Sequence, residues 1–310
     1  MMKTSKSGGS AMRAAFNRLL AGVWLIALLA GAASAQAPVE YRIEYNGSAA
    51  GQNVRSYYRD LIELVLARTQ ARFGPARLVD VPGSSPQGRL LAMLEHGQLD
   101  VLWTATSRQR ESQALAIRIP LDMGLTGQRA LVIRKQDVAR FDAIRDLDDL
   151  RRFKACQGAY WPDNDILRAG GLRVVEYDWI DLAYPAMRTH ECDYLPRAVN
   201  EIDGEVATLG GDDLVVYDRL IIAYPMPMYL FVSRNNVKLA ERLQAGLEGL
   251  VADGGLRRFM EHHPATAGVF RPNRFLGVRV LRLNNPDLPP GTPLSDHRLW
   301  LDLAGLFPPA

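Results

Sequence analysis

A short polar segment, Thr104-Ala105-Thr106-Ser107-Arg108-Gln109-Arg110-Glu111, places hydroxyl and guanidinium side chains close together in the chain. It follows a stretch that is typical of a helix end, a tight turn at Gly97 and a short buried strand starting at Asp100. In an open α/β sheet, ligands bind in the loops at the carboxyl ends of the strands. This polar loop is therefore our first candidate for a binding site.

The first 35 residues have the three-part form of a secretory signal peptide. Four lysines and arginines precede an apolar run at residues 19–30, and Ala33-Ser34-Ala35 forms a small-residue cleavage site. The apolar run is about a dozen residues long, whereas a membrane-spanning helix needs about 20. We expect cleavage after Ala35 and a periplasmic mature protein without a membrane anchor.

Cleavage would also change the charge of the chain. The whole chain carries +3, from 37 basic and 34 acidic side chains. The signal segment holds four basic residues and no acidic ones, so the mature chain has 37 − 4 = 33 basic and 34 acidic side chains, or −1. It also lacks the basic stripe with interleaved aromatic residues that nucleic-acid binding requires, so we expect no nucleic-acid partner.

The elements that must position the polar loop alternate between strand and helix patterns. Residues 39–45 alternate apolar and polar side chains, as strands do, and residues 54–73 have apolar side chains at helical spacing. A strand at 77–81 and a helix at 88–96 then lead to the strand at Asp100. This succession predicts a parallel sheet with helical crossovers.

A second α/β unit follows two further extended segments, residues 114–121 and 128–134. Its expected helices are 146–152, 164–169, 182–190 and 198–209, and its expected strands are 153–157, 173–177, 193–196 and 214–217. An extended segment and two amphipathic helices come next, at 229–233, 238–252 and 256–262. Residues 284–310 hold six of the eighteen prolines, and we expect them to form an extended tail on the surface.

The mature chain has two cysteines, Cys156 and Cys192. An even number of cysteines in an exported protein permits a disulfide. The spacing does not establish one, and two buried thiols on neighbouring strands are the alternative.

The tandem α/β units, the export signal and the Gly-x-x-Asp strand that runs into a Thr/Ser/Arg loop resemble the type II periplasmic solute-binding proteins. The family 3 receptors of ABC transporters, which are of the amino-acid type, are the most similar branch. The resemblance covers about residues 39–283. It implies an α/β fold of two lobes, each a mixed, mostly parallel sheet flanked by helices, joined by a hinge of two crossings. Lobe 1 would comprise residues 36–126 and 230–310, and lobe 2 residues 127–229.

The resemblance also implies a function. A monomer would capture a small solute between its lobes, without a cofactor or metal, and deliver it to an ABC permease or present it to a periplasmic sensor. The solute would be anionic or amino-acid-like.

In that family, a Thr-x-Thr-x-x-Arg loop supplies the arginine that holds the ligand carboxylate. The loop is one residue longer here, so either Arg108 or Arg110 could take this role. We favour Arg110, because the family arginine is commonly followed by another charged residue. The rigid fork of a guanidinium matches a carboxylate with two hydrogen bonds. Thr104, Thr106 and Trp103 would complete this side of the site, and a solvated loop charge is the alternative for each arginine.

The expected second lobe departs from the family pattern. Amino-acid receptors place there an Asp that accepts the ligand ammonium, whereas the position four residues after Asp193 is Arg197. If Arg197 faces the cleft, the ligand presents negative charge to both lobes and is acidic. In the alternative, Glu201 pairs with Arg197 at i,i+4 and holds it away from the ligand.

The loop Gln157-Gly158-Ala159-Tyr160-Trp161-Pro162-Asp163-Asn164 precedes an expected helix, and in the family this loop gives backbone donors to the ligand. A helix N-terminus suits an anion, which makes Gly158 a candidate, although Asp163 or Asn164 could serve only as the N-cap. Trp161, like Trp103, could stack on a ligand or be buried apolar surface. Arg129 is a weaker candidate for the same anion, and Tyr58 and Ser48 are weaker candidates in lobe 1.

Enzymatic motifs are missing from the sequence. It contains no Gly-x-Ser-x-Gly elbow, His-Glu-x-x-His helix, Gly-rich phosphate loop or Cys-x-x-Cys pair. We therefore expect a binding protein with no catalytic residue. Since some relatives of the fold are periplasmic dehydratases, an enzyme in which Glu201 or Asp193 acts as a general acid or base is the alternative.

Overall fold

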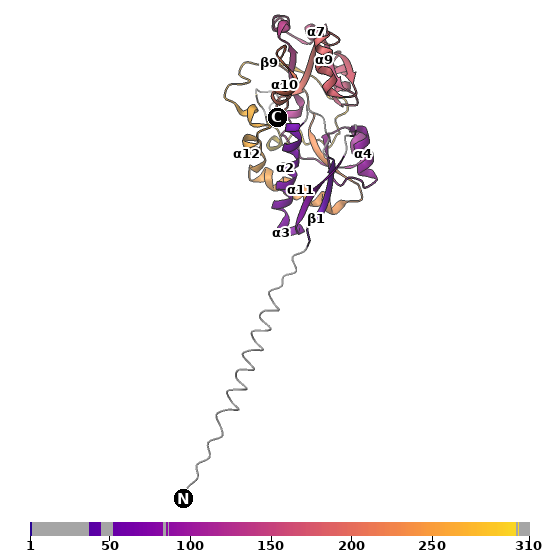
Figure 1. Cartoon of the computed structure of the whole chain (residues 1–310), viewed down its shortest axis with the longest axis vertical. Helices are drawn as coiled ribbons and strands as arrows, with labels where there is room; N and C mark the ends of the chain where they lie inside the picture. Colours follow the sequence, from indigo (N-terminus) through magenta and orange to yellow (C-terminus); the bar gives the residue numbers. More distant parts are fainter. Residues whose placement is uncertain (2–36, 45–51, 83–84, 86, 302, 304–310) are drawn as a thin grey trace. The chain divides into compact units, whose positions relative to one another are not determined.

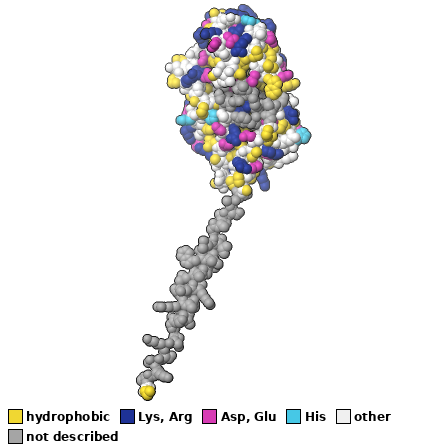
Figure 2. Space-filling model, viewed as in Figure 1, with side chains coloured by type: hydrophobic (Ala, Val, Ile, Leu, Met, Phe, Trp, Pro, Cys, Tyr) yellow, Lys and Arg dark blue, Asp and Glu magenta, His cyan; other side chains and the backbone are white. Residues whose placement is uncertain are grey.

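The computed structural model describes residues 1, 37–44, 52–82, 85, 87–301 and 303. Apart from Met1, the expected signal peptide lies outside the described residues, as does Ser48, so the cleavage site stays a prediction. The described residues from Val39 onwards belong to one structural unit. On the face shown in Figure 2, basic and acidic side chains of this unit are interspersed.

The chain of this unit begins with a strand, two helices and a second strand. Strands β1 (Val39–Glu44) and β2 (Ala76–Val81) pair in parallel, and α2 (Gln52–Arg68) and α3 (Gln70–Phe73) connect them. The apolar positions of α2 are buried, as the helical spacing predicts.

A three-stranded antiparallel sheet continues from these strands. Its order is β3 (Leu102–Ala105), β10 (Met228–Val232) and β4 (Leu115–Ile117). The amide of Asp100 donates a 2.9 Å hydrogen bond to the Arg42 carbonyl, which places the approach to β3 beside β1. The approach to β3 thus has β1 as its neighbour, and the polar segment begins within β3, at Thr104.

The second sheet has six strands in the order β11, β9, β5, β8, β6, β7. Their bounds are β5 (Gln128–Arg134), β6 (Lys154–Gly158), β7 (Arg173–Tyr177), β8 (Tyr194–Ala198), β9 (Leu214–Ala223) and β11 (Arg279–Arg282). Strand β6 pairs in parallel with both β7 and β8, whereas β5 is antiparallel to both of its neighbours. The sheet is therefore mixed, with the two antiparallel pairs of β5 lying between parallel pairs on either side.

Helices flank both groups of strands, and Figure 1 shows α7, α9 and α10 at one end of the unit and α2, α3, α4 and α11 at the other. The remaining bounds are α4 (Gln87–Glu95), α5 (Arg108–Gln113), α6 (Val138–Asp142), α7 (Leu147–Leu150), α8 (Asp163–Ala169), α9 (Ala183–Arg188), α10 (Ile202–Leu209), α11 (Val237–Ala252) and α12 (Gly255–His262). Within the described part of the chain, no helix has the length and apolar character needed to cross a membrane.

Two short segments connect the three-stranded and the six-stranded sheet, residues 118–127 and 224–227, and a longer connection runs from β10 through α11 and α12 to β11. The two short segments are called the crossings. They touch where the Tyr224 amide donates a 3.0 Å hydrogen bond to the Gly127 carbonyl. A Cβ atom at position 127 would lie 2.0 Å from the Tyr224 carbonyl oxygen, so only glycine fits here. Any hinge between the expected lobes would include these two crossings.

The structure corrects three local expectations. Residues 108–113 form the helix α5 instead of a loop, because the Ser107 side chain accepts a hydrogen bond from the Arg110 amide and caps the helix. Strand β8 extends to Ala198 and α10 begins only at Ile202, whereas we expected the helix from residue 198. Strand β9 runs for ten residues, to Ala223, instead of ending at residue 217.

The expectation of a surface tail over residues 284–310 is wrong for its last described part. Leu299, Trp300 and Leu301 are buried. The Leu301 amide donates to the Met123 carbonyl, and the Gln128 side chain donates to the Leu301 carbonyl, at 2.8 and 3.0 Å. Burial of three apolar side chains and these two hydrogen bonds hold the tail against the first crossing.

Cys156 and Cys192 form a disulfide in the structure, with their Cα atoms 5.6 Å apart. Cys156 lies in β6, and Cys192 lies just before the neighbouring strand β8. The bridge therefore joins the two strands that lead to Gly158 and Arg197.

Candidate functional site

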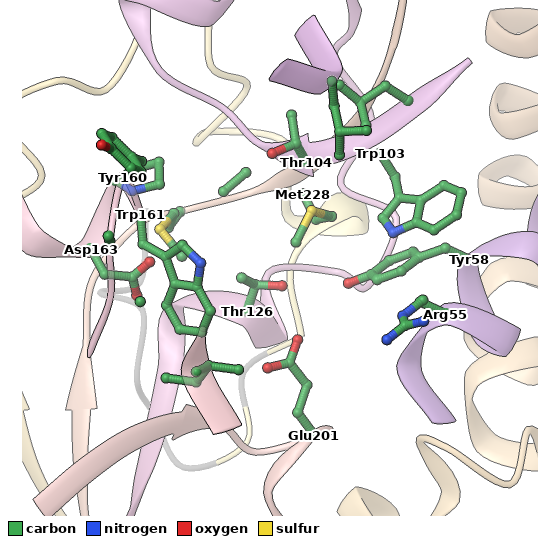
Figure 3. A pocket seen from close by; sticks show the side chains of 18 of the residues that line it. Arg55, Tyr58, Trp103, Thr104, Thr126, Tyr160, Trp161, Asp163, Glu201 and Met228 are labelled. Atoms are coloured by element: carbon green, nitrogen blue, oxygen red, sulfur yellow. The ribbon is translucent and has the colours of Figure 1, made fainter. Parts of the chain in front are cut away.

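A cavity of about 500 Å³ lies where strand ends of the two sheets meet. The end of β3 contributes Trp103 and Thr104, and the six-stranded sheet contributes Arg197 and the segment from Gly158 to Asp163. Met228, at the start of β10, also lines it, as Figure 3 shows. The volume is in the range of small-molecule sites, about 300 to 1,000 Å³.

Aromatic side chains form two facing sides of this cavity. Tyr58, on α2, stacks on Trp103 with ring centroids 5.9 Å apart and an interplanar angle of 28°. Trp161 lies on the other side, with Thr126, Met228 and Glu201 between the two groups (Figure 3). The indole of Trp161 covers Gly158, where a Cβ atom would lie only 2.4 Å from the ring. Glycine at 158 is therefore needed for Trp161 to adopt this position.

Arg197 lines the cavity, but two carboxylates hold its guanidinium. It makes two hydrogen bonds to Glu205, one of them 2.6 Å from Nε to Oε2, and its Nη2 lies 2.7 Å from Oε2 of Glu201. It also stacks on Trp161, 4.8 Å from the ring centroid. The ion pair between Arg197 and Glu201 that the sequence allowed is present.

The balance of charge around Arg197 is negative. Burial disfavours the charged guanidinium, but the carboxylates of Glu205 and Glu201 outweigh this and raise the pKa of Arg197. Burial raises the pKa of Glu205 as well, against the effect of Arg197. One cation faces two carboxylates, so this side of the cavity offers excess negative charge instead of a free anion clamp.

Arg129 is also buried in the cavity wall and is also paired. Its Nη2 lies 2.6 Å from Oδ1 of Asp163, and its Nε donates a 3.1 Å hydrogen bond to the Tyr224 hydroxyl, which in turn donates to Asp163. Burial lowers the pKa of Arg129, but Asp163 reverses this and raises it above the ordinary value.

The N-cap alternative for Asp163 and Asn164 is wrong, because both side chains have other partners. Pro162 precedes the first turn of α8 and makes no side-chain cap. Asp163 binds Arg129, and the Asn164 amide donates a 3.0 Å hydrogen bond to the Gly158 carbonyl.

Arg110, the favoured carboxylate ligand, is buried behind the cavity wall and is not one of the lining residues. Its Nη1 donates to the Thr104 hydroxyl and to the Ala105 carbonyl, at 2.5 and 2.7 Å, and its Nη2 is 3.5 Å from the Tyr160 carbonyl. Burial lowers its pKa to about 10, so it stays charged at neutral pH. Because the Thr104 oxygen accepts from Arg110, the Thr104 hydroxyl hydrogen can point into the cavity.

The two other polar residues of this segment lie elsewhere. The Thr106 hydroxyl donates a 2.7 Å hydrogen bond to Glu111 and does not line the cavity. Arg108 is exposed, and its amide is 3.3 Å from the Asp287 carbonyl. The structure thus brings together six of the eight expected ligand-binding residues, namely Trp103, Thr104, Arg129, Gly158, Trp161 and Arg197.

Sequence reasoning missed several lining residues. Glu205 could have been found, because it follows Glu201 at i+4 and so shares its helix face. Arg55 precedes Tyr58 by three residues on α2 in the same way. Asp178, Trp179, Thr126, Glu44 and the methionines Met226 and Met228 gave no such signal.

Carboxylates outnumber cations in the cavity wall. The lining residues include three arginines, at 55, 129 and 197, and five carboxylates, at 44, 163, 178, 201 and 205. Among the residues that the structure describes, no group of three or more His, Cys, Asp or Glu side chains could hold a metal ion.

Asp122, in the first crossing, is fully buried next to this cavity. It accepts hydrogen bonds from the Gly124 amide at 3.1 Å, from the amide and hydroxyl of Thr126, and from the Tyr58 hydroxyl at 3.3 Å. Burial raises its pKa to about 6, although the hydrogen bond from Thr126 favours the ionised form.

This pKa predicts that stability depends on pH. The folded-state pKa lies above the ordinary value of 3.8, so between pH 4 and 6 the folded protein binds more protons than the unfolded chain. The free energy of unfolding then falls as the pH rises through this window, by up to about 3 kcal/mol.

Asp122→Asn removes this contribution. The unfolding free energy of the variant minus that of the wild type should rise between pH 4 and 6 and stay constant above about pH 7. Urea denaturation at a series of pH values measures this difference. A difference that does not change with pH would contradict the assignment to Asp122.

No protein-family model matches the chain, and no curated protein matches it. Solved structures match its fold. A periplasmic binding protein of Salmonella typhimurium with high arginine specificity is 16% identical, with a TM-score of 0.55, over 72% of this chain and 98% of the other. The GluR0 ligand-binding core from Nostoc punctiforme in complex with L-glutamate is also 16% identical, with a TM-score of 0.52, over 74% and 100%.

A third structure connects the fold to an enzyme. It is an ancestral amino-acid-binding protein described as a precursor of cyclohexadienyl dehydratase, 12% identical with a TM-score of 0.54, over 72% of this chain and 95% of the other. At these identities the comparison shows the fold alone. The chain has the two-lobed fold of the periplasmic binding proteins, as the sequence predicted, with sheets flanked by helices. The six-stranded sheet is mixed, whereas the three-stranded sheet is antiparallel and differs from the mostly parallel sheet that we expected.

Proposed function

We propose that this protein is a periplasmic solute-binding protein that encloses a small, amino-acid-like solute carrying a cationic group. The observation that carries the proposal is the cavity of about 500 Å³, with aromatic rings on facing sides and the Glu201 carboxylate between them (Figure 3). A cation at this position would meet a carboxylate and the faces of aromatic rings, both of which attract it.

The charged side chains of the cavity wall favour a cationic group on the solute over a second anionic group. Arg197, expected as the second anion clamp, is held by Glu201 and Glu205, and Arg129 is held by Asp163. An acidic solute would bring its second negative charge towards these carboxylates at a cost in Coulomb energy. The purely anionic solute that the sequence suggested is therefore not the one that this cavity favours.

The carboxylate end of the solute would lie near Thr104. Its hydroxyl can donate to a carboxylate, and the charge of Arg110 polarises it from behind, at 2.5 Å. Arg110 would then contribute to binding through Thr104 instead of by direct contact. Met226 and Met228 give the wall flexible apolar surface for the body of the solute.

Closure around the solute would involve the two crossings, with lobe 1 as residues 36–126 and 230–310 and lobe 2 as residues 127–229. Strand β11, at 279–282, lies within the range of lobe 1 but pairs with β9 of the six-stranded sheet, so the C-terminal segment would link both lobes. An ABC permease or a periplasmic sensor would receive the loaded protein.

The experiment that tests the role of Glu201 is the substitution Glu201→Gln. It keeps the shape of the side chain and removes its charge, so we expect about 10- to 100-fold weaker binding of L-lysine or L-arginine, as for a lost hydrogen bond to a charged group. Titration calorimetry measures the affinity, with L-norleucine, which lacks the side-chain ammonium of lysine, as the neutral reference ligand. Glu241→Gln, at an exposed site on α11, is the matched control. Equal affinity for lysine in the wild type and in Glu201→Gln would remove Glu201 from the site.

The dehydratase-like alternative has one observation in its favour. Glu205 lines the cavity, and burial raises its pKa, which suits a general acid. Both of its carboxylate oxygens, however, accept hydrogen bonds from Arg197, which supports a structural role. Turnover of prephenate-like acids by the purified protein, lost in Glu205→Gln, would support the enzyme instead of the binding protein.

A further inference from the structure

The C-terminal segment that follows α12 contacts the helix that carries the two cavity glutamates. Arg274 binds Asp203 through both guanidinium ends, Nη1 to Oδ2 at 2.6 Å and Nη2 to Oδ1 at 2.8 Å. Arg271 adds a third hydrogen bond, from Nη2 to Oδ2 at 2.6 Å. Such a two-pronged pair fixes orientation as well as distance.

The surroundings of Arg274 make this pair well defined. The Arg274 side chain is only 5% exposed, it lies over the Phe275 ring, and its Nη1 also donates to the Gly268 carbonyl at 3.0 Å. A Cβ atom at position 268 would lie 3.1 Å from Oδ2 of Asp203, so the backbone there approaches the carboxylate closely. Residues 268–274 thus pack closely against the Asp203 side chain.

Asp203 occupies the second position of α10, between the two carboxylates that bind Arg197. Glu201 precedes the helix and Glu205 lies one turn further on, with its side chain buried. One side of this first turn therefore binds Arg197 in the cavity, and the other binds Arg274 outside it. The described chain after Met228 supplies no lining residue of the cavity, so Arg274 acts on the site indirectly. Its main contact is with Asp203 of α10, and its Nε also lies 3.6 Å from Oδ2 of Asp218 in β9.

We propose that Arg274 and Asp203 are positioning residues for the solute site, holding the start of α10 so that Glu201 and Glu205 keep their places in the cavity wall. This inference rests on the proposed function, which supplies the ligand, and on the contacts of α10, which supply the mechanism. The C-terminal segment would then influence the ratio of the affinities for cationic and neutral solutes without touching the solute.

The test uses Arg274→Lys, which keeps the charge and removes the fork, and Asp203→Asn, which changes α10 and leaves the C-terminal segment intact. Hydrogen–deuterium exchange of the full-length mature protein should be about tenfold faster at residues 202–209 in either variant, and unchanged in α2. Arg257→Lys is the matched control, because Arg257 binds Glu261 within α12. Unchanged exchange at 202–209, or equal acceleration in α2 and α10, would overturn the proposal.

A second measurement uses L-lysine and L-norleucine as probes in titration calorimetry. We expect the ratio of their affinities to fall in Arg274→Lys and Asp203→Asn by about tenfold, whereas a mere loss of stability would leave this ratio unchanged. If the wild type binds lysine and the ratio of the two affinities is unchanged in both variants, the positioning role is overturned. If the wild type binds neither probe, the proposed function fails, and the exchange measurement still decides whether Arg274 holds α10.

Discussion

Replacing Arg197 with methionine is expected to lower the free energy of unfolding by about 3 to 5 kcal/mol, one of the two largest effects that we predict for a change in this chain. Arg197 is 6% exposed, and its guanidinium binds both Glu201 and Glu205. Methionine has a similar length and no charge, so the buried Glu205 would lose its cation. An uncompensated buried carboxylate is costly because water no longer solvates it.

A compensated variant separates this effect from lost packing. Arg197→Met combined with Glu201→Gln and Glu205→Gln removes both signs of charge, and we expect it to regain most of the lost stability. Arg152→Met is the control, since Arg152 pairs with Asp149 at the surface. Urea denaturation gives the free energies. If the single and the triple variant were equally destabilised, packing of the arginine stem would be the cause instead of charge.

The double substitution Cys156→Ser and Cys192→Ser should cost about 4 kcal/mol of unfolding free energy. The disulfide links positions 36 residues apart, and this cost is what the chain-entropy model gives for a loop of that length. Both cysteines are fully buried, so serine hydroxyls would also need hydrogen-bond partners there.

The measurement is guanidinium denaturation of the wild type and of the double variant, both without reductant. The matched control is the wild type treated with dithiothreitol under denaturing conditions and refolded in its presence, which should resemble the variant. Equal midpoints for oxidised wild type and variant would show that the disulfide contributes little. Because the bridge joins the strands that lead to Gly158 and Arg197, loss of solute affinity should accompany the loss of stability.

The alternation of strands and helices was predictable because it depends on local spacing. The apolar residues of α2 repeat with the helical period, and β1 alternates as a half-buried strand does. A helix boundary was harder to predict where it depends on a single capping side chain. Ser107 caps α5 by accepting from the Arg110 amide, and this turned an expected loop into a helix.

Partners of buried charges were less predictable, since they depend on contacts between distant elements. Arg129 finds Asp163 on another element, 34 positions along the chain, and Glu205 reaches back from α10 to Arg197 in β8. The ion pair between Arg197 and Glu201, at i,i+4, could be predicted locally. The spacing of Glu201 and Glu205 indicates a shared helix face, but it does not say which residue Glu205 binds. The residue types of the site were thus predictable, whereas the sign of its net charge required the fold.

The buried end of the C-terminal segment illustrates the same limit. A high proline content indicates an extended chain but does not say what the chain packs against. Leu299 to Leu301 lie against the first crossing because Met123 and Gln128 supply hydrogen bonds there. No local sequence pattern predicts these partners.

A cationic group on the solute is the property that the cavity wall favours, and one titration measures this preference. Purified mature protein, stripped of bound ligand by unfolding and refolding, is titrated in a calorimeter with L-arginine, L-lysine, L-glutamate and glutarate at neutral pH. We expect arginine or lysine to bind at least about 100-fold more tightly than glutarate, a difference of about 3 kcal/mol. Tight binding of glutarate with no binding of arginine or lysine would contradict this expectation and would restore the acidic solute that the sequence first suggested.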